Sequence, residues 1–214
     1  MNQSVTRIVA VRHGQTAWNV ATRIQGQIDI GLNAAGREQA RRVALALARE
    51  DIDAVYASDL QRAADTGRAL AERLGLPLRT EATLRERAFG EFEGLTWDEV
   101  KQRHPDASRR WRQRDPSFGP PGGETLQDFV ARAVEALAAI AARHRGQHIA
   151  LVTHGGVLDA LYRASARIAI DAKRTWQLGN ASINRVLHGD HGFTLVGWND
   201  ALHLEGDALE EGAA

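Results

Sequence analysis

Two histidines that each follow a short apolar run are the side chains of this sequence best suited to covalent chemistry. The run 8–11 leads into Arg12 and His13, and the run 149–152 leads into His154. Each histidine is followed by glycine, which lets the backbone approach a ligand closely. A neutral imidazole is a nucleophile toward phosphorus, and a guanidinium matches phosphoryl oxygens with paired N–H donors. These residue types predict the binding and transfer of a phosphoryl group.

Two more charged residues follow strand-like runs. Arg62 comes after the run 54–57, and Glu86 comes after a third such run. Arginine charge near His13 is expected to lower the pKa of the imidazole and keep it neutral. A carboxyl group beside a phosphate dianion is favoured in its protonated form, which suits Glu86 to act as a general acid.

The alternation of apolar runs with amphipathic segments predicts the elements that bring these groups together. Strands are predicted at 8–11, 54–57, 77–82 and 149–152, and as a hairpin at 183–187 and 193–198. Helices are predicted at 36–50, 60–74, 125–143, from about 157, and over a short segment that opens at Thr96 and ends at Pro105. Runs that are apolar on both faces are typical of buried parallel strands. We therefore predict an α/β protein, a three-layer α/β/α sandwich with a mostly parallel central sheet, whose ligand lies at the carboxyl ends of the strands.

Length and composition narrow the class of protein. The 214 residues suit one domain, which we place at 1–204, with a lid-like insertion at about 87–123 and a flexible tail at 205–214. Without cysteine there are no disulfides, thiolate metal sites or cysteine nucleophiles. Lys+Arg and Asp+Glu both number 27, so no basic excess indicates a nucleic-acid partner. No apolar run approaches the ~20 residues of a membrane span, and no secretory signal is recognised, so we expect a cytoplasmic protein.

Several motifs spread over residues 7–200 occur together in one known family. They are Arg12-His13-Gly14-Gln15-Thr16 with Asn19, Gln25-Gly26, Ser58 with Leu60 and Arg62, Leu84 with Glu86, and His154-Gly155-Gly156. On these motifs the chain resembles the histidine phosphatase superfamily, in the branch of the cofactor-dependent phosphoglycerate mutases and their phosphatase relatives.

The resemblance implies a phosphoglycerate mutase-like fold and a phosphohistidine intermediate on His13. It also implies that the phosphoryl oxygens are held by Arg12, Arg62, His154 and Asn19. Glu86 would protonate the leaving oxygen and then deprotonate the incoming water. No metal ion is expected, because arginines supply the positive charge.

Other residues of this chain are candidates for phosphate or substrate binding, each with a structural alternative. They are Thr16, Gln25, Gly26, Ser58, Arg87, Gly155 and Asn180. Ser58, for example, would equally suit the cap of the following helix, and Asn180 would suit a turn. The predicted lid also holds aromatic side chains that either pack together or contact substrate, namely Phe89, Phe92, Trp97, Trp111 and Phe118.

The sequence favours a phosphatase and leaves a mutase open. Only 67 residues separate Glu86 from His154, as in the shorter phosphatase branch, and Phe89 stands where the mutases have tyrosine. A mutase would need 2,3-bisphosphoglycerate as phosphoryl donor, whereas a phosphatase needs no cofactor. A third alternative is a phosphate-binding module without turnover, which would have no use for Glu86. The expected partner is a small phosphorylated metabolite, and the expected assembly is a monomer or homodimer.

Three further signals are interpreted as structural. Asp51 and Asp53 match an aspartyl-nucleophile pattern but precede their strand, so they lie at the wrong end of it. His188 and His191 fall in a hairpin turn without other metal ligands nearby. The basic run 109–114 is interpreted first as a solvated helix face and, as an alternative, as a rim that attracts an anionic substrate.

Overall fold

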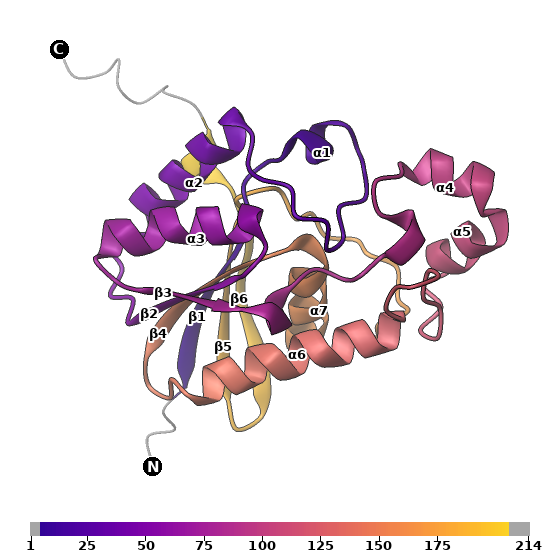
Figure 1. Ribbon diagram of the computed structural model, residues 1–214. Helices are drawn as coiled ribbons and strands as arrows, with labels where there is room; N and C mark the ends of the chain where they lie inside the picture. Colours follow the sequence, from indigo (N-terminus) through magenta and orange to yellow (C-terminus); the bar gives the residue numbers. More distant parts are fainter. Residues whose placement is uncertain (1–4, 206–214) are drawn as a thin grey trace.

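A six-stranded sheet forms the centre of the protein (Figure 1). The computed structural model describes residues 5–205. The strand order is β3-β2-β4-β1-β5-β6. Four strands run parallel, namely β1 (Thr6–Arg12), β2 (Ala54–Ser58), β3 (Leu78–Glu81) and β4 (His148–Thr153), while β5 (Ile183–Gly189) and β6 (Gly192–Asp200) form the antiparallel hairpin. The predicted α/β/α sandwich with a mostly parallel sheet is confirmed.

Helices cover both faces of this sheet (Figure 1). On one face, α2 (Ala34–Ala46) and α3 (Gln61–Leu74) pack on Val9 and Val11 of β1. On the other face, α6 (Leu126–Ala142) and α7 (Gly155–Ala166) pack on Ile8 and Ala10 of the same strand. Successive side chains of a strand point to opposite faces, so a strand between two helical layers has to be apolar throughout. This requirement explains the uninterrupted apolar runs of the sequence.

A smaller apolar core lies under the segment that follows β3. Its buried members are Ile24, Phe92, Val100 and Phe118. They are carried by the loop before α2, by the 3-10 turn Gly90–Phe92, by α4 (Trp97–Arg103) and by the chain after α5 (Pro105–Arg112). We call the segment 87–123 the cover segment. It includes the predicted short helix, which opens with a capping box at Thr96 as expected, while Pro105 starts a second helix as well as ending the first.

The remaining differences from the predicted elements have local causes. The one-turn helix α1 (Ala17–Val20) was not predicted, because four residues are too few for an amphipathic pattern. The second helix spans Ala34–Ala46 instead of 36–50, since the side chain of Asn33 caps its start. Helix α7 begins at Gly155, before the predicted start. Within residues 5–205, no helix combines the length and apolar character that a bilayer span requires. The tail predicted for 205–214 lies, after its first residue, outside the described residues.

Candidate active site

The carboxyl ends of β1 and β4 carry the two histidines to one place. These strands are neighbours, and Arg12 is paired with Thr153 in their register, so His13 and His154 follow at the same edge. Their ring centroids are 5.3 Å apart. Arg62 arrives on the first turn of α3, and Glu86 on the irregular chain after β3. A cavity of about 220 Å³, here called the phosphoryl pocket, is lined by Arg12, His13, Asn19, Arg23, Ile24, Gln25, Gly26, Arg62, Glu86, Phe89 and Trp97.

The hydrogen bonding of His13 fixes which of its nitrogens is free to react. Nδ1 lies 2.7 Å from the carbonyl oxygen of Gly14. Because a carbonyl only accepts, Nδ1 carries the proton and Nε2 keeps its lone pair. Burial lowers the pKa of His13 well below its ordinary value, and the charges of Arg62 and Arg12 lower it further. The sequence predicted the effect of the arginines, but burial is the larger cause. The ring is therefore neutral at neutral pH, with a free lone pair on Nε2.

His154 is fully buried and has unused hydrogen-bonding capacity. Among the described residues, neither of its ring nitrogens has a hydrogen-bond partner. Burial, followed by the charges of Arg62 and His13, lowers the pKa of His154 well below its ordinary value. A buried polar group without a partner is costly in free energy. The ring is therefore suited to bind a ligand atom beside His13.

The two arginines are held in place by backbone carbonyls. Arg12 donates from Nη1 to the carbonyl of Leu178 at 2.7 Å. Arg62 is 1% exposed and donates to the carbonyls of Ile28 and Gly26 at 3.0 and 2.7 Å. The Nε of each arginine is buried and has no partner among the described residues. Burial lowers the pKa of Arg12 to about 10, so the guanidinium remains charged at neutral pH. Two fixed cations with free N–H donors suit a phosphoryl dianion.

Backbone N–H groups hold the carboxylate of Glu86. Oε1 accepts from the N–H of Arg87 and Oε2 from that of Gly156, each at 2.9 Å. A Cβ atom at position 156 would lie 2.1 Å from Oε1. This close approach is the reason that the second residue of α7 is a glycine. The sequence motif contained Gly156, but nothing in it indicated that the glycine seats the carboxylate.

The lesser candidates divide between the pocket and its support. Thr16 and Asn19 cap α1 reciprocally, and Asn19 also lines the phosphoryl pocket. Gln25 lines the pocket, and its Oε1 is buried without a partner among the described residues. Gly26 lines it as well, at a positive φ of 52°, and its carbonyl binds Arg62.

The other candidates lie beside the pocket. Asn180 donates to the carbonyl of His13 at 3.0 Å, so it supports the loop that carries His13. Ser58 is buried and accepts from the N–H of Leu60 at 3.3 Å, while Asp29 accepts from the N–H of Gln61 at 2.7 Å and thus caps the start of α3. The N-cap position is Leu60 and not Ser58, because α3 begins at Gln61 and the N-cap is the residue directly before the helix.

A second cavity of about 270 Å³ adjoins the phosphoryl pocket and shares Arg12, Glu86 and Phe89 with it. We call it the leaving-group pocket. Its wall is apolar at Phe89, Trp111, Leu126, Phe129 and Val130, and charged at Arg87, Arg114, Asp159 and Arg174, with Gly155 and Gly156 completing it. Candidate residues Arg87 and Gly155 thus line this pocket and not the first.

Positive charge exceeds negative charge at the far end of the leaving-group pocket. Asp159 accepts from Arg163 Nε at 2.9 Å and from Arg114 Nη2 at 3.1 Å, and Arg174 Nε lies 3.9 Å from its other oxygen. Three guanidiniums therefore face one carboxylate. A third cavity, of about 350 Å³, shares Arg114 and Arg174 with this pocket and adds the charged residues Arg112, Asp115 and Lys173. Sequence reasoning included Arg114 in the basic run 109–114 but missed Asp159, Arg163 and Arg174, because they come from other segments and no local pattern joins them to it.

The aromatic side chains of the cover segment have two roles. Phe92 and Phe118 are buried in the small core. Phe89, Trp97 and Trp111 form a wall beside the pockets, in which the two tryptophan rings stack with centroids 4.7 Å apart and Phe89 lies 5.2 Å from Trp111. Phe92 and Phe118 thus follow the packing alternative, while Phe89, Trp97 and Trp111 remain candidates for substrate contact.

Of the three signals interpreted as structural, the aspartates lie where predicted, whereas the basic run 109–114 is not simply a solvated helix face, because α5 ends at Arg112 and Arg114 lines the leaving-group pocket. Asp53 accepts from the N–H of His148 at 2.8 Å, just before β2 and at the opposite end of the sheet from His13. Over residues 5–205, no group of three histidine, aspartate or glutamate side chains is arranged to hold a metal ion.

Comparisons with known proteins agree on one family. A model described as histidine phosphatase superfamily (branch 1) matches residues 8–201. The metal-independent phosphoserine phosphatase of Arabidopsis thaliana is 41% identical over 207 residues, with 95% of this chain and 85% of that protein covered. Phosphoglycerate mutase-like protein 4 of the same plant is 40% identical over 203 residues, with 92% and 86% covered. The structure of mycobacterial glucosyl-3-phosphoglycerate phosphatase with VO3 has a TM-score of 0.82 at 35% identity, with 91% of this chain and 99% of that chain covered.

Proposed function

The chain belongs to the histidine phosphatase superfamily, and from this premise we propose which substrate this phosphatase hydrolyses and which residues carry out each step. We propose a small phosphomonoester whose alcohol carries a second anionic group, hydrolysed without a metal ion. The observation that carries the proposal is the excess of guanidinium charge at the far end of the leaving-group pocket. We treat residues 1–204 as one domain, which is supported by the single family match over 8–201.

In the first step, Nε2 of His13 attacks phosphorus. The free Nε groups of Arg12 and Arg62, with His154 and Asn19, bind the phosphoryl oxygens. An N–P bond forms while the bond from phosphorus to the alcohol oxygen breaks. Glu86 lines both pockets, at the junction where that oxygen lies, and gives it a proton. The alcohol then leaves.

In the second step, water takes the place of the alcohol. The carboxylate of Glu86 accepts a proton from the water, whose oxygen attacks phosphorus. The N–P bond breaks and inorganic phosphate is released, which restores neutral His13. Arg12 and Arg62 stabilise the charge on the transferred group in both steps, as positioning and electrostatics dominate phosphoryl transfer.

The substrate class follows from the far wall of the leaving-group pocket. A carboxylate two or three bonds from the ester oxygen would reach from Glu86 toward Arg114 and Arg174, past the apolar side chains of Phe89 and Leu126. Phosphoserine and glucosyl-3-phosphoglycerate, for which two of the relatives are named, both carry such a carboxylate. The same class of substrate is proposed for this chain.

The substrate assignment is tested with a matched pair, 3-phosphoglycerate and glycerol 3-phosphate, which differ in one carboxylate. We expect kcat/KM in EDTA to be at least about tenfold higher for 3-phosphoglycerate, because charge-assisted hydrogen bonds contribute roughly 1.5–3 kcal/mol. Equal kcat/KM values for the two esters would refute the proposal that the substrate carries a second anionic group. Faster isomerisation than hydrolysis in the presence of 2,3-bisphosphoglycerate would instead establish a mutase.

The residue roles are tested on the intermediate and on the acid. Rapid quenching should trap an acid-labile phosphoryl group on His13, and H13A should form none. E86Q should lower kcat/KM for benzyl phosphate, whose leaving oxygen needs a proton, about 10²-fold. It should spare p-nitrophenyl phosphate, whose leaving group departs without one. An equal loss on both esters would refute the role of Glu86.

A further inference from the structure

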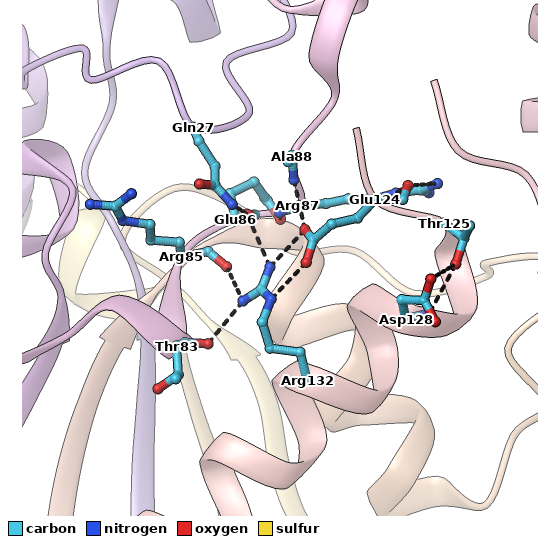
Figure 2. Close-up of polar contacts among 10 residues, drawn as sticks. All are labelled: Gln27, Thr83, Arg85, Glu86, Arg87, Ala88, Glu124, Thr125, Asp128 and Arg132. Atoms are coloured by element: carbon cyan, nitrogen blue, oxygen red, sulfur yellow. Dashed lines mark hydrogen bonds and ion pairs between the residues drawn. The ribbon is translucent and has the colours of Figure 1, made fainter. Parts of the chain in front are cut away.

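One arginine outside the phosphoryl pocket contacts the backbone on which Glu86 is carried. Figure 2 shows Arg132 reaching from α6 toward the chain after β3. Its Nη1 donates to the carbonyls of Thr83 and Arg85 at 2.9 and 3.1 Å, and its Nη2 donates to the carbonyl of Glu86 at 3.4 Å. Arg132 thus binds the chain immediately before the acid and at the acid itself.

Glu124 holds this arginine and also binds the chain on the other side of the acid. Its two carboxylate oxygens accept from Nε and Nη2 of Arg132 at 2.7 and 2.8 Å (Figure 2). The same carboxylate accepts from the N–H of Ala88 at 2.8 Å, and the carbonyl of Glu124 accepts from Arg87. Residues 83–88 are therefore bound on both sides of Glu86 by one ion pair.

The backbone at Glu86 depends on such contacts because it lacks regular structure. Residues 85–89 belong to no helix or strand, so their carbonyl groups have no ladder partners. Gln27 also donates to the carbonyl of Glu86, at 3.1 Å. The bidentate geometry of an arginine–carboxylate pair fixes direction as well as distance. A shift of about 1 Å at a catalytic group costs on the order of 10²-fold in rate.

We infer that Arg132, held by Glu124, is a positioning residue that keeps the carboxyl group of Glu86 in line with the leaving oxygen. The inference rests on the proposed role of Glu86 as the acid. Arg132 itself lines neither the phosphoryl pocket nor the leaving-group pocket. Its loss should therefore affect proton transfer to the leaving group and leave phosphoryl binding intact.

The test compares benzyl phosphate with p-nitrophenyl phosphate, two aromatic esters without a second anion. In R132Q we expect kcat/KM to fall about tenfold for benzyl phosphate and less than about twofold for p-nitrophenyl phosphate. R132K, which keeps the charge, should recover part of the loss. R143Q is the matched control, because Arg143 follows the same helix and pairs with Glu81 at 2.9 Å, away from Glu86. It should change neither value by more than about twofold.

A double variant separates positioning from general destabilisation. If Arg132 acts through Glu86, R132Q should cost less than about twofold on benzyl phosphate when E86Q is already present. Unfolding of part of the sample would instead lower the apparent kcat/KM for both esters by the same factor. Equal losses on the two esters, or a full tenfold loss in the E86Q background, would overturn the inference. If R132Q does not fold, the same comparison is made with E124Q, which should lower kcat/KM about tenfold for benzyl phosphate and less than about twofold for p-nitrophenyl phosphate.

The outcome for E86Q keeps the two proposals apart. If E86Q lowers kcat/KM mainly for benzyl phosphate while R132Q lowers it equally for both esters, only the positioning role is overturned. An unselective loss in E86Q overturns the acid assignment and the positioning role with it.

Discussion

Replacement of Gly156 by alanine should disable the acid while leaving the phosphoryl pocket intact. The new Cβ would lie 2.1 Å from Oε1 of Glu86 and 3.0 Å from Cζ of Phe129. Because α7 is packed on the sheet and Phe129 is buried, the carboxyl group has to move by at least about 1.3 Å to reach ordinary contact at 3.4 Å. A displacement of that size breaks the 2.9 Å hydrogen bond from Arg87. It should cost about 10²-fold in general-acid catalysis.

The assay for G156A is kcat/KM on the benzyl and p-nitrophenyl esters. We expect kcat/KM to fall about 10²-fold for benzyl phosphate and less than about threefold for p-nitrophenyl phosphate. G155A is the comparison variant, since a Cβ there would lie 3.6 Å from Nε of Arg12, an ordinary contact. Alanine in a helix is favoured over glycine by up to ~1 kcal/mol, so both variants should fold. If G156A hydrolyses benzyl phosphate with an unchanged kcat/KM, or if G155A shows the same fall in kcat/KM as G156A, the reasoning is refuted.

Three further predictions concern the pH dependence of stability, the recognition of the substrate's second anionic group and the stabilisation of the protein by a bound oxyanion. The lowered pKa values of His13 and His154 mean that the unfolded chain binds more protons, so stability should fall as pH drops below the ordinary histidine value of about 6.5. In urea titrations at several pH values, H13N should flatten this slope by up to about 1.4 kcal/mol per pH unit, and an unchanged slope would contradict the assignment. R174A should raise KM for 3-phosphoglycerate about tenfold and leave glycerol 3-phosphate within about twofold, whereas equal changes would place the second anion elsewhere. Orthovanadate at 100 times its Kd should stabilise the folded protein by about 2.7 kcal/mol, as measured by urea unfolding. R62Q should remove most of that stabilisation under the same conditions, and full stabilisation in R62Q would contradict a role in oxyanion binding.

The sequence predicted the parts of the site that follow strand ends. His13 and His154 could be placed together because parallel strands present their carboxyl ends at one edge of a sheet. The apolar character of the runs at 8–11 and 149–152 was sufficient to identify those strands. The order of the strands, which makes β1 and β4 neighbours, came from packing and not from any local pattern.

The supporting groups could not be predicted in this way. Arg132 and Glu124 reach the chain at Glu86 from α6 and its preceding loop, 38 to 46 residues further along the sequence. An amphipathic helix of this composition would place an arginine at its polar face in any case. Likewise the role of Gly156 depends on a contact with Glu86, which lies 70 residues earlier in the sequence. Contacts between distant segments leave no periodicity in the sequence, so they appear only when the chain is folded.

The separate apolar core of the cover segment has a consequence for how such an enzyme diversifies. Ile24, Phe92, Val100 and Phe118 hold this segment together without help from the two cores that flank the sheet. Changes to the wall at Trp97 or Trp111 should therefore leave the folding of the sheet, and with it the position of His13, largely undisturbed. Substitutions at that wall can therefore reshape the pockets beside His13 while the sheet that carries this histidine keeps its fold.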